Sequence, residues 1–100
     1  MIEALPLPPL AGTRKRAQEL LSALPDKLVG CTIVVDCRGL VAATQSFADE
    51  LLQGVLVERN ATEMRFTNVD DLKFARWIDE RADFHGVSER VKVDRRSPRD

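Results

Sequence analysis

The run from Cys31 to Val35 (CTIVV) constrains the fold of this chain more than any other segment. It is almost continuously apolar and β-branched, whereas a strand with one face in solvent alternates apolar and polar side chains. Asp36 ends the run, and a loop follows it. We therefore expect a strand that is covered on both faces, as in a parallel sheet with helices on each side.

Two amphipathic helices are predicted on either side of this strand. Thr13 is a suitable N-cap for the first, which carries apolar side chains at the i, i+3, i+4, i+7 spacing until Pro25 ends it. The second begins near Ser46, where Ser46 and Asp49 match the N-cap and N3 positions of a capping box. Gly54 weakens this second helix, so we expect it near the helix end or where another backbone approaches.

A third helix begins at Asn68 or Asp70 and ends at His85. Strands are predicted before and after it, at residues 63–68 and 87–93. Helices and strands thus alternate along the chain, which predicts an α/β fold with a short, mainly parallel sheet and about three helices.

Length and composition indicate a single globular domain. A chain of 100 residues has room for one hydrophobic core, and 44% hydrophobic and 31% charged residues are ordinary globular values. The net charge of −1 creates no general attraction to nucleic acid or to an anionic membrane. We expect an extended, proline-rich segment at residues 1–12, the domain at residues 13–94 and a basic tail at residues 95–100.

The sequence argues against several classes of site and location. No segment approaches the roughly 18 apolar residues of a membrane span, and the first residues do not resemble a secretory signal, so a cytoplasmic location is expected. Cys31 and Cys37 form no CxxC pair and have no histidine at metal-ligand spacing. We therefore expect two small buried thiols and predict neither a metal nor a cofactor.

Residues 35–52 (VDCRGLVAATQSFADELL) combine a strand end, a loop and a helix start. Loops at the carboxyl ends of parallel strands are where open α/β sheets bind ligands and partners. This segment resembles the STAS-like (anti-sigma-factor-antagonist-like) family, in which a strand ending in Val/Leu-Asp precedes a Gly-aliphatic loop and a Ser-Phe-Ala-Asp-Glu-Leu helix start. Residues 46–51 match that helix start without a mismatch. The resemblance implies a small STAS-like sandwich.

The resemblance also implies a non-enzymatic regulatory domain. In STAS proteins, a partner kinase of the histidine-kinase-like ATPase group phosphorylates a serine in this loop and thereby switches binding of the anti-sigma factor. An ungapped alignment places Gln45 at that serine, so the candidate phospho-acceptors become Ser46 and Thr44. The expected partner is a histidine-kinase-like ATPase or a sigma-factor regulator, and the expected partner-binding residues are Arg38, Gln45, Ser46, Asp49 and Glu50.

Two other functions remain open. Basic clusters at residues 14–16 and 90–99 would suit a small nucleic-acid-associated module, although no aromatic residues interleave with them as stacking platforms. A thiol-dependent enzyme would use Cys37 as its nucleophile and would need a depressed thiol pKa. His85, the one histidine, stands where the third helix ends, and we expect a helix-end residue there rather than a catalytic base.

Overall fold

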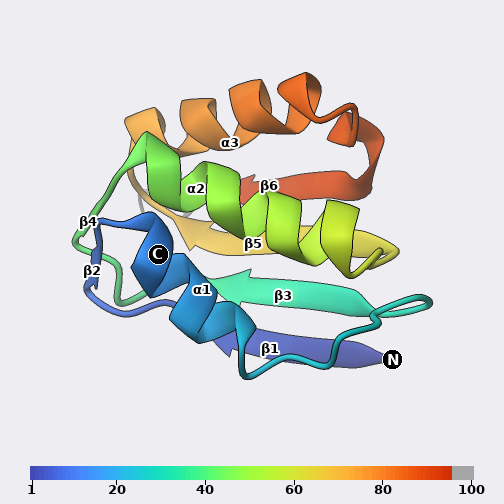
Figure 1. The fold of residues 1–100 in the computed structure, drawn as a ribbon. Helices are drawn as coiled ribbons and strands as arrows, with labels where there is room; N and C mark the ends of the chain where they lie inside the picture. The colour runs from blue at the N-terminus through green and yellow to red at the C-terminus, as the bar shows by residue number, and fades with distance from the viewer. Residues whose placement is uncertain (96–100) are drawn as a thin grey trace.

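The computed structural model, which describes residues 1–95, contains a four-stranded parallel sheet with three helices (Figure 1). The strands lie in the order β1 (Ile2–Pro6), β3 (Thr32–Asp36), β5 (Glu63–Val69) and β6 (Val91–Arg95). The helices α1 (Arg14–Leu21), α2 (Gln45–Leu52) and α3 (Leu72–Phe84) connect successive strands. The predicted α/β class with a short parallel sheet and three helices is confirmed.

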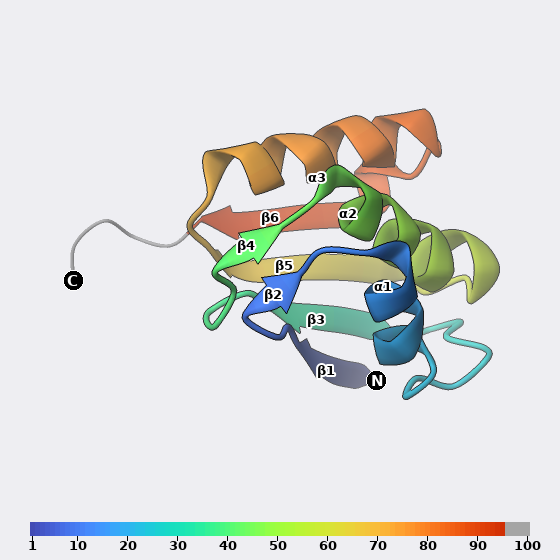
Figure 2. The same ribbon diagram turned by 60° about the vertical axis from the view of Figure 1, so that its left-hand side comes forward.

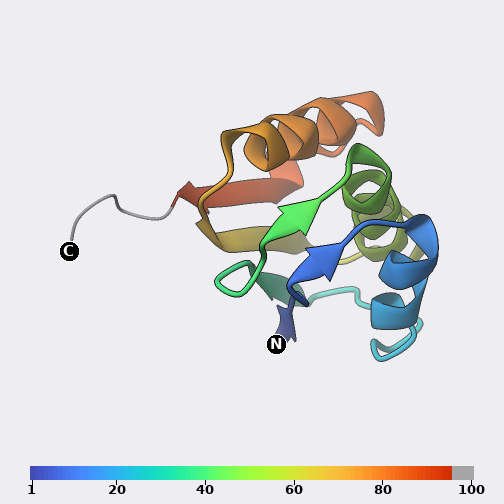
Figure 3. The same ribbon diagram turned by 90° about the vertical axis from the view of Figure 1, so that its left-hand side faces the viewer.

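All three helices lie on the same face of the sheet, so the expectation of helices on both faces is wrong (Figures 1 and 3). The chain adds its strands in one direction across the sheet, and right-handed crossovers in that order place every helix on the same side. In β3, Ile33 and Val35 are fully buried, whereas Thr32 and Val34 are half-buried on the open face. Because Thr32 and Val34 on the open face are also β-branched, the sequence of β3 does not show the alternation of buried and half-buried residues along the strand.

The open face of the sheet carries charged side chains beside these residues. Val34 lies in register between Ala4 of β1 and Arg65 of β5. The Arg65 guanidinium forms ion pairs with Glu63 at 3.4 Å and with Asp94 at 3.6 Å. This face is thus a mixed surface of small apolar residues and paired charges.

The proline-rich segment at residues 1–12 contains two strands. β1 pairs with β3 at the edge of the sheet, and β2 (Leu10–Ala11) pairs with β4 (Ala42–Ala43) in a separate two-stranded sheet (Figure 2). The segment is extended, as predicted, and belongs to the domain. At the other end, Arg95 is part of β6 rather than of a tail, and residues 96–100 lie outside the described part of the chain.

The predicted start of α1 is correct, but the helix ends at Leu21 rather than at Pro25, and the start of α3 differs from the prediction. Thr13 caps α1, since its Oγ1 accepts a hydrogen bond from the Arg16 N–H at 3.0 Å. The cap of α3 is Asp71, not Asn68 or Asp70, although His85 ends the helix as expected. Asn68 instead has a left-handed φ of 58° at an irregularity in β5, a conformation that asparagine tolerates better than most residues.

Helix α2 lies between α1 and α3 and continues into a π-helical segment, η1 (Gln53–Glu58). Phe47 is fully buried, as predicted for a core residue. Gly54 lies where α1 crosses: a Cβ built on it would stand 2.3 Å from Leu21 Cδ1. The approaching group is thus a side chain and not a backbone.

Two arginines bind the carbonyl groups around η1. Arg59 donates through Nη1 to the Gly54 carbonyl at 3.2 Å. Arg90, in the short 3-10 helix η2 (Ser88–Arg90) before β6, donates to the carbonyls of Leu56 at 2.9 Å and of Ala61. Because a π-helical segment disturbs the regular α-helical hydrogen bonds, these contacts stabilise the end of the second helix.

We predict that Gly54→Ala lowers the free energy of unfolding by about 1–2 kcal/mol, because overpacking outweighs the helix propensity gained. Urea unfolding measures the loss, and Val57→Ala, on the exposed side of η1, is the matched control. In a Leu21→Ala background the Gly54→Ala change should be neutral or stabilising. An equal loss in both backgrounds would contradict the contact with Leu21.

Candidate functional site

The candidate site lies at the end of the molecule where the parallel strands finish and the helices begin. Residues 37–44 leave β3, form β4 and lead into α2, and Figure 1 shows this loop beside β2 on the side opposite the N-terminus. The structure therefore places the predicted loop and helix start at the carboxyl edge of the sheet, as the sequence indicates.

Thr44, and not Ser46, is the N-cap of α2. Its Oγ1 accepts a hydrogen bond from the Phe47 N–H at 3.2 Å and donates to the Gly12 carbonyl at 3.2 Å. The predicted capping box of Ser46 and Asp49 is therefore wrong, because both residues lie inside the helix. Gln45 and Ser46 occupy its first turn with exposed side chains.

Asp49 is the centre of a cluster that joins the three helices. Its side chain is buried, with the residue 6% exposed. Oδ2 accepts a hydrogen bond from Arg14 Nη1 of α1 at 3.0 Å, and Oδ1 accepts one from Arg81 Nε of α3 at 2.9 Å. His85 Nε2 lies 2.7 Å from the same Oδ1, and it donates because the carboxylate carries no proton.

Burial and hydrogen bonding change the pKa of Asp49 in opposite directions. Burial raises its pKa, but the hydrogen bonds from His85, Arg14 and Arg81 outweigh burial and hold the pKa below its ordinary value of 3.8. The carboxylate is therefore ionised at neutral pH and acts as the counter-charge for the guanidinium groups around it. The hydrogen bond to Asp49, and next the one to Glu50, raise the pKa of Arg14.

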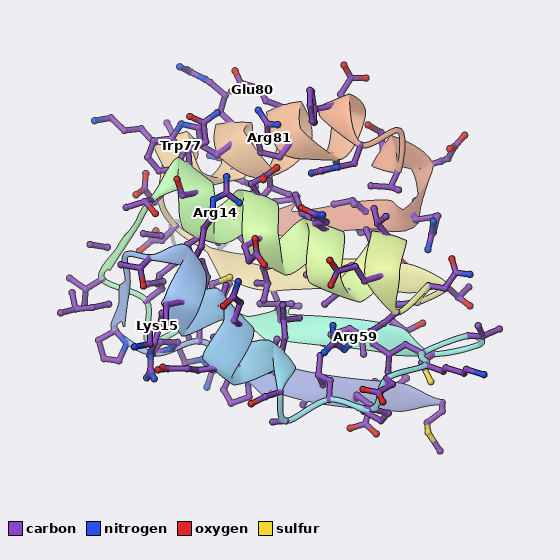
Figure 4. All side chains as sticks on the ribbon, viewed as in Figure 1. Arg14, Lys15, Arg59, Trp77, Glu80 and Arg81 are labelled. Carbon is purple, nitrogen blue, oxygen red and sulfur yellow. The ribbon has the colours of Figure 1, made fainter. Side chains whose placement is uncertain are left out.

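Glu50 extends the connection between α1 and α2. Its Oε1 accepts a hydrogen bond from Arg14 Nη1 at 3.1 Å, and its Oε2 accepts one from Gln18 Nε2 at 3.2 Å. Figure 4 shows the Arg14 side chain reaching from α1 toward α2, with Arg81 above it on α3. Asp49 and Glu50 thus hold the helices in place and position Arg14.

A small polar hollow of about 190 Å³ lies beside this cluster. Its walls combine the two arginines and Asp49 with the exposed residues of the first turn of α2. Of the predicted partner-binding residues, the structure gathers three in this hollow. The lining residues are Arg14, Gln45, Ser46, Asp49 and Arg81.

Arg38 is exposed in the loop after β3, away from this hollow. Its backbone N–H donates to Asp36 Oδ1 at 2.9 Å, and Asn68 Nδ2 donates to the same oxygen at 3.1 Å. The Arg38 N–H and the Asn68 amide lower the pKa of Asp36. Within residues 1–95, no described contact joins the Arg38 side chain to the Asp49 cluster.

Three residues of this cluster, Arg14, Arg81 and His85, are not among the predicted partner-binding residues. His85 was expected as a helix-end residue, and it is indeed the C-cap of α3, but its ring also binds Asp49. Arg81 was not considered as a functional residue. The signal in the sequence is their spacing, because positions four apart lie on the same side of a helix. The second signal is Asp49, an acidic residue among the apolar positions of α2, to which Arg81 and His85 bind.

The structure argues against the thiol-enzyme alternative. Burial, and next the charge of Asp36, raise the pKa of Cys37 to about 12. Cys37 is buried as predicted, whereas Cys31 is half-buried at the edge of the core. A thiol with this pKa has too little thiolate at neutral pH to act as a nucleophile.

Three of the six described residues of the basic clusters are engaged in contacts inside the domain. Arg14 binds Asp49 and Glu50, Arg16 forms an ion pair with Glu19 at 3.0 Å, and Arg90 binds backbone carbonyls. The remaining cluster residues beyond position 95 lie outside the described chain. These contacts disfavour a nucleic-acid surface built on residues 14–16 and 90–95.

Residues 1–95 contain no group of three or more His, Cys, Asp or Glu side chains arranged to hold a metal ion. No helix in the same residues has the length and apolar character that a membrane span requires. Comparison of the chain with known protein families, with curated proteins and with solved structures finds no match.

We predict that Asp49→Asn destabilises the fold by about 2 kcal/mol at pH 7, because several charged hydrogen bonds lose their acceptor charge. The lowered pKa of Asp49 means that its contribution is complete above pH 3.8 and is lost as the pH falls below that value. The gap between wild type and variant, measured by chemical unfolding, should therefore narrow at low pH. Asp79→Asn on the exposed side of α3 is the control, and a gap that does not depend on pH would contradict this prediction.

We predict that Cys37 reacts with iodoacetamide at least about thirtyfold more slowly than an ordinary thiol at pH 7. Its pKa of about 12, against an ordinary 9.0, lowers the thiolate fraction about a thousandfold, and the greater nucleophilicity of a high-pKa thiolate offsets only part of this loss. Mass spectrometry of timed samples measures the rate, and the unfolded protein in urea supplies the reference. Rapid modification of Cys37 in the folded protein would restore the nucleophile hypothesis.

Proposed function

We propose that this chain is a regulatory protein-interaction domain, similar to anti-sigma-factor antagonists, and that its partner binds at the start of α2. The observation that carries the proposal is the polar hollow in which Gln45 and Ser46 are exposed while buried Asp49 positions Arg14 and Arg81. Such a surface presents charge and hydrogen-bonding groups in a fixed geometry, as a specific protein contact requires.

The switch residue in this proposal is Ser46 rather than Thr44. The Thr44 hydroxyl already caps α2 and binds the Gly12 carbonyl, so a phosphate on Thr44 would disrupt both contacts. Ser46 is exposed in the first turn of α2, where the helix dipole favours negative charge, and Arg14 and Arg81 line the same hollow. Phosphorylation of Ser46 would change the charge of the surface and leave the core intact.

The partner proposed from the family resemblance is a histidine-kinase-like ATPase or a sigma-factor regulator. Gln45, at the position of the usual phospho-acceptor serine, acts here as a contact residue, because its exposed amide can both donate and accept hydrogen bonds. Asp49 and Glu50 act indirectly, by fixing Arg14. Arg38 adds an exposed charge further along the same edge of the sheet.

The test uses the full chain as bait in lysate of the source organism, followed by affinity measurements on the captured protein. We expect Gln45→Asp and Ser46→Asp to weaken binding by at least about tenfold, because the added carboxylate neutralises the positive charge that Arg14 and Arg81 offer the partner in this hollow. Ser88→Asp, which adds the same charge at an exposed site at the start of η2, is the matched control. Circular dichroism verifies that each variant is folded.

Equal affinity of wild type, Gln45→Asp and Ser46→Asp for the captured protein would refute a binding surface at the start of α2. Equal losses in these variants and in Ser88→Asp would show a general charge effect and would refute it as well.

A further inference from the structure

A second hollow at the carboxyl edge lies beside the loop after β3, and both polar and apolar side chains line it. This pocket has a volume of about 270 Å³. Leu40 and Val41 of the loop form one side, and Val69 and Phe74 are almost fully buried beneath it. The volume lies just below the range of about 300–1,000 Å³ for ligand sites, and it suits one branched or aromatic side chain.

The rim of this pocket is acidic. Asp70 and Asp71 line it at the end of β5 and the beginning of α3. Asp71 caps α3 through Oδ1, which accepts a hydrogen bond from the Lys73 N–H at 2.8 Å, while its side chain remains on the surface. A group that enters the pocket therefore meets the apolar side chains of Leu40 and Val41 and the negative charge of Asp71.

Exposed apolar residues continue beyond the pocket. Val41 at its mouth is 75% exposed, and Leu72, the neighbour of Asp71 in the chain, is 59% exposed. Leu10 is 67% exposed and belongs to β2, which pairs with β4 directly after Val41. A small molecule filling only the pocket would leave these side chains in water, whereas a polypeptide segment would cover them.

We propose that this pocket receives an apolar side chain of the protein partner, and that an adjacent Lys or Arg of the partner lies against Asp71. The proposal rests on the proposed function, because it assigns a second contact to the same partner. The occupant is a short cationic-hydrophobic segment: the apolar side chain supplies buried area, and the basic residue supplies charge complementarity with the rim.

The test titrates the folded chain with two synthetic tetrapeptides and follows backbone amide shifts by NMR. The probes are acetyl-Gly-Phe-Arg-Gly-amide and its counterpart with Glu in place of Arg. We expect the Arg peptide to shift the amides of Leu40, Val41, Val69 and Phe74 and to bind about tenfold more tightly than the Glu peptide. Equal affinities, or shifts that lie elsewhere, would overturn the proposal.

Two variants test the pocket directly. Asp71→Asn keeps a residue that can cap α3 but removes the negative charge. It should weaken binding of the Arg peptide about threefold, as expected for the loss of an exposed ion pair. Val41→Lys places a cation at the mouth of the pocket and should abolish binding. The matched controls are Asp79→Asn on α3 and Val57→Lys on η1, and unchanged binding in both pocket variants would overturn the proposal.

Two further measurements separate the alternatives. Phenethylammonium carries the same ring and charge without a peptide backbone, and if it bound as tightly as the Arg peptide, a small amine would be the occupant and the proposal would fall. Partner affinity is also measured for Val41→Lys. If Ser46→Asp weakens partner binding and Val41→Lys does not, the proposed function stands and the proposed role of the pocket is refuted. If the Arg peptide binds and Val41→Lys weakens partner binding, but Ser46→Asp leaves partner binding unchanged, the proposed partner site at the start of α2 is refuted instead.

Discussion

The carboxylate of Asp49 fixes the relative positions of the three helices. It accepts hydrogen bonds from α1 through Arg14 and from the second half of α3 through Arg81 and His85, while it belongs to α2 itself. Burying an ionised group is costly unless its oxygen atoms are satisfied, and here three donors satisfy both oxygen atoms. The arrangement of the helices and the charge of the surface above them therefore depend on the same side chain.

This dependence supports the proposed partner site at the start of α2. Apolar contacts hold the helices against the sheet but permit small shifts, whereas directional bonds to one carboxylate define how Arg14 and Arg81 stand beside Ser46. The exposed groups are thus supported by a rigid base, which reduces the ordering that binding would otherwise require. The second pocket lies at the same end of the sheet, as the proposal that one partner contacts both sites requires.

The sequence predicts elements whose evidence is local. The spacing of apolar residues locates the helices, and Thr13 is a correct cap because its hydrogen bond closes within one turn. Thr44 and Ser46 both have a hydroxyl group that can cap α2, so the local sequence does not distinguish them. The residue that caps the helix, Thr44, also binds the carbonyl of Gly12, which is 32 positions away in the chain. Likewise, Asp49 meets Arg81 and His85 through helix packing that no local pattern specifies. Thr32 and Val34 misled the assignment of faces, since β-branched side chains favour strands whether or not a helix covers them.

The parallel pairing of the main sheet also determines how the chain must reach this structure. Partner residues in neighbouring strands are about thirty positions apart, so each strand pair forms only after a helix-bearing segment has closed. At a synthesis rate of about 5–20 residues per second, β1 leaves the ribosome on the order of seconds before β3. Pro6 lies within β1, and a proline on an edge strand removes a donor that a second chain would need for pairing. The residue therefore limits wrong pairing while the first strand waits for its partner.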